Sequence, residues 1–162
     1  MEKAYLPELW HEAYVVLGTG AAALAGLVIV AASVRADHVM GTRHLRVRAR
    51  NNTLSMISIL GGSILVLLPQ DATWLGIEQT VFNLAWAALP VSTIVHERRN
   101  PTGAPLHLVA LAAWFYIMSA AGGVSLIAHW GGGLYLITTA YFAFLLITVL
   151  NAFRLLLQPD QT

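Results

Sequence analysis

Long apolar stretches without charged residues constrain this chain more than any other feature. The first runs over residues 13–34 and contains no Asp, Glu, Lys or Arg. A helix that crosses the hydrocarbon core of a bilayer needs about 20 such residues. Charged residues make up only 10% of the chain, whereas about a quarter of the residues in a soluble domain are charged. We therefore expect an all-α integral membrane protein.

Five mainly apolar stretches predict a bundle of five transmembrane helices that forms a single domain over residues 1–162, and the charged residues within them, Glu78 and Arg154, lie near span ends. The expected spans are residues 13–34, 53–69, 75–95, 104–128 and 132–157. The basic segment before the second span, residues 35–52, is expected to be a loop. Residues 131–133 are three consecutive glycines, which predict a tight turn before the last span.

The arginines predict the orientation of these spans. With five spans, one side of the membrane receives Lys3 alone and the other side receives eight arginines. They are Arg35, Arg43, Arg46, Arg48, Arg50, Arg98, Arg99 and Arg154. Because basic residues concentrate on the cytoplasmic side, we expect the N-terminus outside and the C-terminus in the cytoplasm.

Four of the arginines, Arg43, Arg46, Arg48 and Arg50, fall within eight residues of one another. Next to a membrane span, each basic residue gains about 1 kcal/mol from anionic lipids near the surface. This segment is therefore predicted to contact anionic lipid headgroups at the cytoplasmic face. One short juxtamembrane segment does not indicate a nucleic-acid partner.

Small residues predict where the helices approach one another, because helices pack closely in lipid where side chains are small. Gly18, Ala22 and Gly26 follow one another at four-residue intervals in the first span, and Ser58 and Gly62 do so in the second. We expect these stripes to hold the bundle together. The alternative is that one of them, with the first as the candidate, forms a contact between subunits.

The third span carries the most polar helical face, formed by Thr80, Asn83, Ala87 and Pro90. This face is expected to look inward, toward other helices or a pore. Pro90 removes a backbone hydrogen bond and predicts a kink. Glu78 lies near the start of the span and is either the acid of a pore mouth or an interfacial carboxylate that reaches water. Glu78, Thr80, Asn83 and Pro90 are the candidate pore and gating residues.

Several classes of function are not supported by the residues present. The chain has no cysteine, which excludes disulfides, thiolate metal sites and thiol catalysis. No charged residue falls in the middle of a span, where proton pumps and coupled transporters usually need one. The chain has no motif for a catalytic triad, a phosphate-binding loop or a metalloprotease helix, so we expect neither an enzyme nor a cofactor.

Four histidines lie near the predicted span ends, with His11 and His129 on the outer side and His96 and His107 on the inner side. Two such pairs resemble the outline of a di-haem cytochrome b, in which facing helices supply the axial ligands. His11 and His129 are also candidates for a divalent metal, because imidazole and neighbouring carboxylates suit Zn²⁺ or Cu²⁺. The simpler interpretation, which we adopt, is that these histidines are solvated.

Aromatic residues agree with the predicted depth of the spans. Trp10, Tyr14, Trp74 and Trp130 all fall at the predicted outer interface. Amphipathic rings concentrate at the boundary between lipid and water. We therefore expect these four side chains to lie at the headgroup level.

The run Gly-Thr-Gly-Ala-Ala-Ala-Leu-Ala-Gly-Leu-Val-Ile-Val-Ala-Ala-Ser over residues 18–33 precedes the basic segment and a span that ends in Leu-Leu-Pro. This stretch resembles a group of small bacterial membrane proteins with a Gly/Ala-rich first helix, over roughly residues 15–70. The group has no assigned activity, so the resemblance implies a source and no function. The expected location is the bacterial cytoplasmic membrane.

Three functions remain open at this stage. The leading hypothesis is a homo-oligomeric channel or pore-forming protein for ions or small solutes, because a single five-helix bundle has little room for a water-filled path. The second is a non-catalytic accessory subunit of a larger membrane complex. The third is a b-type haem electron carrier that uses the four histidines.

Overall fold

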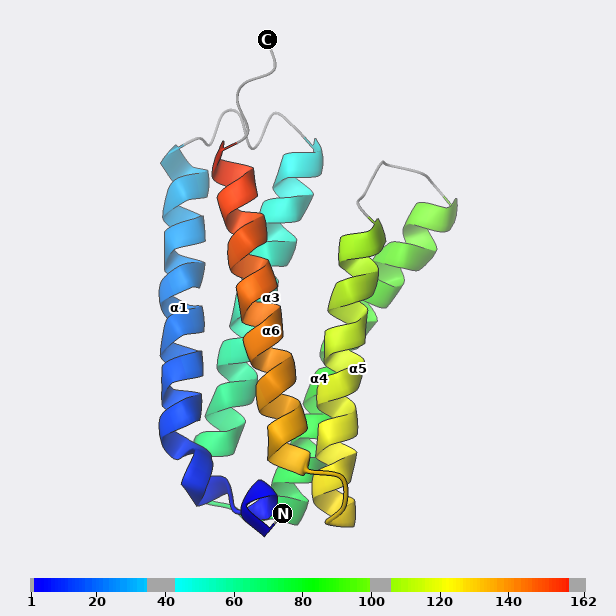
Figure 1. Cartoon of the computed structure of the whole chain (residues 1–162). Helices are drawn as coiled ribbons and strands as arrows, with labels where there is room; N and C mark the ends of the chain where they lie inside the picture. Colours follow the sequence, from blue (N-terminus) through cyan, green and yellow to red (C-terminus); the bar gives the residue numbers. More distant parts are fainter. Residues whose placement is uncertain (1, 35–42, 100–105, 158–162) are drawn as a thin grey trace.

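The computed structural model describes residues 2–34, 43–99 and 106–157, and every regular element in these ranges is helical. Two short 3₁₀ turns, η1 and η2, come first, and five long helices follow (Figure 1). The bounds are Glu2–Tyr5 for η1, Pro7–Trp10 for η2, His11–Val34 for α1, Arg43–Leu67 for α3, Ala72–Arg99 for α4, Leu106–Ala128 for α5 and Gly133–Leu157 for α6. The all-α prediction is confirmed.

Three segments of the described chain are long and apolar enough to cross a membrane. They are Pro7–Val30, which covers most of α1, Val109–Ala128 in α5 and Gly133–Ala152 in α6. The helices α3 and α4 are as long, but arginines begin α3 and end α4. The prediction of a helical membrane protein is thus supported by three of the five expected spans.

The helices pack as two pairs joined by the last helix. The pairs are α1 with α3 and α4 with α5, and α6 packs against α5 as well as against α3 and α1. All the helices run roughly side by side in Figure 1, but the α4–α5 pair leans away from the other three toward one end of the bundle. At that end α3 begins with Arg43 and α4 finishes with Arg99; we call it the arginine end, and the opposite end, with the first residues, the amino end.

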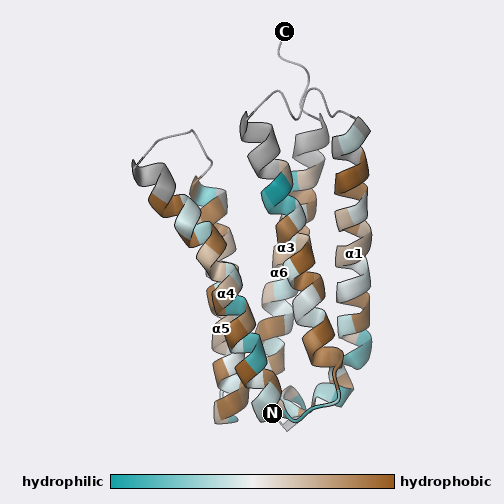
Figure 2. Ribbon diagram, turned by 180° about the vertical axis from the view of Figure 1, so that it is seen from behind, coloured by the Kyte–Doolittle hydropathy of each residue, from teal (hydrophilic) through white to brown (hydrophobic). Residues whose placement is uncertain are grey.

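The main core lies between all five helices. Its largest fully buried members include Tyr14, Ile59, Leu75, Leu126 and Ile137, one from each helix. A smaller cluster of Ala25, Val28, Met56 and Ala152 joins α1, α3 and α6 nearer the arginine end. Many large hydrophobic side chains are also exposed. Figure 2 shows hydrophobic residues along all five long helices and the most hydrophilic ones in isolated turns.

The expected loop over residues 35–52 is wrong in its second part, because α3 begins at Arg43 and residues 43–52 are helical. The segment from Arg43 to Asn52 contains neither glycine nor proline, and arginine, leucine and alanine are good helix formers. Hydropathy marks where a helix enters the bilayer, and a helix can continue beyond that point. The remainder of the expected loop, with Arg35, lies outside the described residues.

The expected glycine turn is present between α5 and α6. Gly131 and Gly132 both have a φ of +88°, a backbone conformation in which a side chain would be strained. His129 precedes them with a φ of +50°. The Ser125 hydroxyl stabilises the turn, because it donates to the Trp130 carbonyl and accepts the Gly133 N–H at 2.9 Å.

The N-terminal turns close the amino end of the bundle. The Tyr5 hydroxyl accepts the Gly132 N–H at 3.1 Å, and the Trp10 ring meets the Tyr135 ring edge-on at 4.6 Å between centroids. Trp74 and Trp130 are exposed at this end. Tyr14, which the aromatic pattern also assigned to the interface, has a fully buried ring, and its hydroxyl bonds to that of Thr138 at 2.9 Å.

Candidate functional site

The most polar part of the bundle interior is built on two amides of α4. Gln79 and Asn83 lie one helical turn apart, and both side chains are fully buried. The Asn83 amide donates to the Gln79 side-chain oxygen Oε1 at 3.0 Å and to the Gln79 backbone carbonyl at 2.7 Å. Because a buried amide is costly without partners, this pairing fixes both rotamers.

Residues from α3 and α6 complete this group, which we call the amide network. The Gln79 Nε2 donates to the Gly62 carbonyl of α3 at 2.7 Å. The Tyr141 hydroxyl of α6 lies 3.0 Å from Gln79 Oε1 and 3.3 Å from Asn83 Oδ1, so its one proton is within reach of either acceptor. Four residues therefore tie three helices together at one level of the bundle.

Gly62 permits this arrangement because it has no side chain. A Cβ atom at this position would overlap the Tyr141 hydroxyl. A second close approach joins α4 to α5, where a Cβ on Gly76 would lie 2.7 Å from the Gly123 carbonyl oxygen. Thr80 lies at the same contact between α4 and α5. Its hydroxyl is 2.7 Å from the Gly76 carbonyl of α4 and 3.4 Å from the Ala120 carbonyl of α5.

Two further polar pairs connect helices in the core. The Ser58 and Tyr116 hydroxyls lie 2.8 Å apart and join α3 to α5, and the Tyr14–Thr138 pair joins α1 to α6. Within the described ranges, Asn52 Nδ2 is the one enclosed side-chain nitrogen or oxygen atom without a hydrogen-bond partner. The polar groups of the amide network are thus all used inside the chain.

The candidate pore residues fall into two places. Asn83 and Pro90 are buried and Thr80 is half-buried, so this face of α4 looks into the chain's own bundle. Glu78 is half-buried elsewhere on the helix, where Gln70 Nε2 donates to its carboxylate at 2.9 Å. Helix α4 runs through Pro90 without interruption, and the Ser92 and Thr93 hydroxyls donate to the Leu89 carbonyl.

The candidate packing residues also fall into two places, inside the bundle and on its outer surface. Ser58 and Gly62 are buried, and Gly18 is packed so closely on α3 that an added Cβ would lie 3.2 Å from the Ser63 Cβ. Ala22 is exposed, and Gly26 has open space where a side chain would stand. The stripe thus starts inside the bundle and continues on its outer surface.

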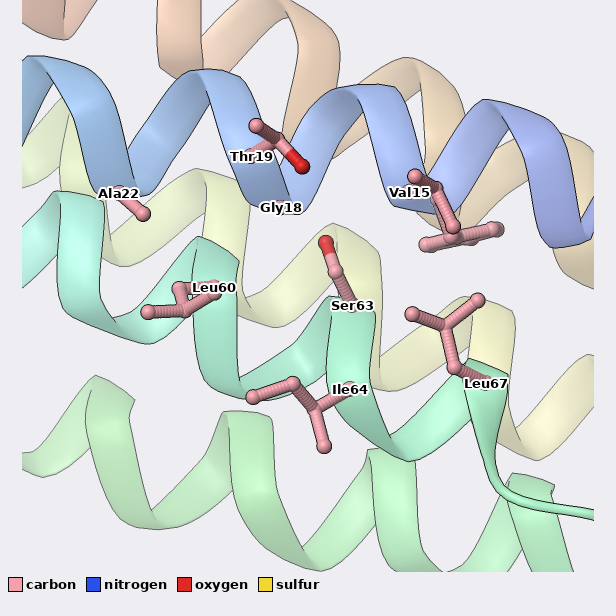
Figure 3. A pocket seen from close by; sticks show the side chains of 9 residues that line it. Val15, Gly18, Thr19, Ala22, Leu60, Ser63, Ile64 and Leu67 are labelled. Carbon is pink, nitrogen blue, oxygen red and sulfur yellow. The ribbon is translucent and has the colours of Figure 1, made fainter.

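A shallow apolar groove of about 270 Å³ lies beside this stripe between α1 and α3 (Figure 3). Val15, Thr19 and Ala22 line it from α1, and Leu60 and Ile64 from α3. The groove opens to the outside of the bundle and is separate from the amide network.

His11 and His129, at the amino end of the bundle, both make contacts within the chain. His11 Nε2 lies 3.1 Å from the Leu67 carbonyl, and the His129 ring lies 5.5 Å from that of Tyr5. No group of three or more His, Cys, Asp or Glu side chains that could hold a metal occurs in the described part of the chain. His107 is exposed at the start of α5, and the side chain of His96 lies outside the description.

Of the four arginines predicted to contact lipid, Arg50 is exposed on α3. Arg43, Arg46 and Arg48 belong to the same helix, but their side chains lie outside the description.

Sequence reasoning selected Asn83 and Gly62 but missed Gln79 and Tyr141. The four-residue spacing of Gln79 and Asn83 in an apolar helix was a readable signal, because side chains at that spacing meet on one face. The contact with Tyr141 joins residues 62 positions apart and has no local signal.

Comparison with known proteins adds no relative: no family model, no curated protein and no solved structure matches this chain.

Proposed function

We propose that this chain is a five-span protein of the bacterial cytoplasmic membrane that acts as a non-catalytic accessory subunit of a larger membrane complex. Its N-terminus lies outside and its C-terminus in the cytoplasm. Three apolar helices support a membrane location. Helices α3 and α4 are 25 and 28 residues long, or about 37 and 42 Å at 1.5 Å per residue, which is enough to cross beside them.

The amide network is the observation that carries the functional proposal. A solute path through this bundle would need polar groups free to replace water. The donors and acceptors of Gln79, Asn83 and Tyr141 instead bond to one another and to Gly62, and they occupy the space between α3, α4 and α6. Such an interior supports a compact scaffold that other membrane proteins bind.

The outer surface offers a place for that binding. Ala22 and Gly26 are exposed one turn apart on α1, where small side chains allow another helix to approach closely. The experiment is purification of the tagged chain from its native membranes in a mild detergent, followed by quantification of the proteins that remain with it. The proposal predicts at least one foreign membrane subunit at a fixed ratio.

Replacement of both small residues, A22L with G26L, should reduce the amount of that subunit without reducing the amount of the chain. The matched control is V16L, because Val16 is exposed on a different face of α1. Recovery of the chain without any stoichiometric partner would overturn the proposal.

A homo-oligomeric channel is the second candidate, and Glu78 is the observation that favours it. Its half-buried carboxylate lies near the amino end of α4, where copies from several subunits could surround a pore mouth. Reconstituted wild-type protein would then conduct ions, and Glu78→Gln would change that conductance. An absence of current from protein that is correctly folded would reject the channel.

A further inference from the structure

The groove between α1 and α3 lies on the outside of the bundle, where a membrane protein meets lipid (Figure 3). Helix α1 carries one of the three segments that are apolar enough to cross a membrane. The hydroxyls of Tyr14 and Ser63 in the groove wall are bonded within the chain, to Thr138 at 2.9 Å and to the Ile59 carbonyl at 2.8 Å. Apart from Thr19, the other lining residues are apolar, so the groove suits an apolar occupant.

The lining residues indicate that this occupant is thinner than a helix. Val15 of α1 and Ile64 of α3 both line the groove, with exposed fractions of 49% and 48%. Closely packed membrane helices meet at small residues, and branched side chains on both sides of the groove hold a helix backbone away from its floor. A helix with its side chains is about 10 Å wide. A single acyl chain is only one methylene group wide and can lie between the two side chains.

The groove covers the depth of one leaflet. Glu12 is the last charged residue before the uncharged residues 13–34, and it therefore marks the edge of the hydrocarbon core. Along α1, Val15 lies about 4.5 Å and Ala22 about 15 Å beyond Glu12. Half of a core about 30 Å thick is about 15 Å. An acyl chain that enters at the amino end can thus follow the groove to the middle of the bilayer.

Glu12 stands at the mouth of the groove and on the same face of α1. At about 100° per residue, Val15, Thr19 and Ala22 all lie within about 80° of Glu12 around the helix axis. All four residues are exposed. The carboxylate of Glu12 is therefore placed to meet the headgroup of a lipid whose acyl chain fills the groove.

The charge at this end selects the headgroup. Five acids lie at the amino end against one lysine, Lys3, and they are Glu2, Glu8, Glu12, Asp71 and Glu78. This balance repels an anionic headgroup and attracts a cationic group. A primary ammonium has three N–H donors, which a carboxylate accepts in charge-assisted hydrogen bonds. A quaternary ammonium has the same charge and no donor.

We propose that the groove between α1 and α3 binds one acyl chain of a phospholipid with a primary ammonium headgroup, such as phosphatidylethanolamine, and that Glu12 binds the ammonium. The proposal rests on the membrane location given under the proposed function, and it does not require the accessory role. The lipid lies beside the helix that we place at Ala22 and Gly26, with Ala22 at the boundary between the two.

Native mass spectrometry of the full chain tests the headgroup. The protein is released from nanodiscs that contain phosphatidylethanolamine, phosphatidylcholine and phosphatidylglycerol in equal amounts and with the same acyl chains. The wild type should retain phosphatidylethanolamine over phosphatidylcholine by about two- to fivefold, as expected for an exposed ion pair, and phosphatidylglycerol least. Glu12→Gln should remove most of this preference.

Glu78→Gln is the matched control for charge, because it removes one carboxylate from the same end of the bundle but from a helix of the other pair. It should leave the preference unchanged. Equal losses in Glu12→Gln and Glu78→Gln would overturn the proposal in favour of a general attraction to the acidic end. Equal retention of phosphatidylethanolamine and phosphatidylcholine by the wild type would overturn it as well.

A second pair of variants tests the groove itself. Thr19→Phe places a ring in the groove and should lower the amount of retained phosphatidylethanolamine severalfold. Val16→Phe, at the same depth but outside the groove lining, should not. Both positions are exposed, so neither ring has to enter the core. If Thr19→Phe instead displaces a second copy of the chain or a foreign subunit and leaves the lipid unchanged, a protein helix occupies the groove and the proposal is overturned.

Flotation with vesicles of the same three lipids separates this proposal from its premise. A chain that floats, resists alkaline extraction and shows no lipid preference lies in the membrane without this site. A chain that alkali extracts would overturn the membrane location and the site together. Recovery of the chain without a foreign subunit, with the lipid preference intact, would reject the accessory role and support the site.

Discussion

At position 62 a hydrogen atom stands where any other residue carries a carbon, and the Tyr141 hydroxyl occupies the adjoining space. Gly62→Ala should therefore destabilise the protein by about 1–3 kcal/mol, the usual cost of overpacking. Gly26→Ala is the matched control, because nothing lies within 4 Å of the added atom. Reversible unfolding in mixed micelles measures both, and equal effects would contradict the close contact at Gly62.

The members of the amide network differ in how many bonds depend on them. Tyr141→Phe removes one hydroxyl but leaves Gln79 bonded to Asn83 and Gly62, so we expect a loss of about 0.6 kcal/mol, and at most about 1.7, as for other polar contacts within membranes. Gln79→Leu removes the bonds of the Gln79 side chain to Gly62, Asn83 and Tyr141, and leaves Asn83 bonded only to the backbone carbonyl of residue 79 and to Tyr141, so it should cost more.

The same unfolding experiment ranks the two variants. A Tyr141→Phe protein less stable than the Gln79→Leu protein would contradict the central place of Gln79 in the network.

The candidate site was predictable only where a residue is unusual in its own helix. Asn83 and Gly62 could be selected because an amide and a small residue stand out in apolar spans. Tyr141 could not be selected, because tyrosine occurs in cores, at interfaces and on surfaces that face lipid. Its partners are determined by how α6 packs on α4, which depends on the whole bundle.

At the scale of elements, α4 and α5 are joined by glycines that bring their backbones together. A Cβ on Gly123 would overlap the Thr80 hydroxyl and lie 2.8 Å from the Gly76 carbonyl oxygen. Gly123→Ala should force the two helices apart and lower stability by about 1–3 kcal/mol. Gly20→Ala is the control, since its added atom would meet only Leu145 at 4.0 Å. A thermal unfolding temperature for Gly123→Ala as high as that of the control would contradict this contact.

The bounds of four of the five helices lie within a few residues of the bounds that hydropathy predicted. This agreement is expected because side chains that face lipid and side chains in the core are both apolar. The start of α3 could not be predicted in this way. From Arg43 to Asn52 the chain is polar, and its helical form depends on local propensity and continuity with the apolar turns that follow. Composition therefore indicated the apolar part of α3 and left open where the helix begins.

At the scale of the whole molecule, the two helix pairs are held together by α6 and by polar contacts in the half of the bundle toward the amino end. The bonds from Gln79 to Gly62 and from Ser58 to Tyr116 cross between the pairs there, and Tyr141 bonds α6 to α4. Toward the arginine end the α4–α5 pair leans away (Figure 1). Among the described residues, the amide network thus adds polar contacts between the helix pairs to the packing of α6 on α5.

The proposed five-span protein requires that α3 and α4 both cross the membrane. Asp71 lies between these two helices, so the side of the membrane that it faces tests this requirement. Asp71 is exposed, and its carboxylate accepts the Thr73 N–H at the start of α4. The chain contains no cysteine, so Asp71→Cys adds the only thiol for a membrane-impermeant maleimide. Cysteines at Glu8 and Gln158 serve as the outer and cytoplasmic controls in intact cells.

With five spans, the thiol at position 71 lies outside and should be labelled in intact cells as fully as the thiol at position 8. If only α1, α5 and α6 crossed the membrane, position 71 would lie in the cytoplasm and react only after the cells are opened, as position 158 does. Labelling of position 71 in intact cells is thus expected for a five-span bundle, and labelling only after the cells are opened would overturn it.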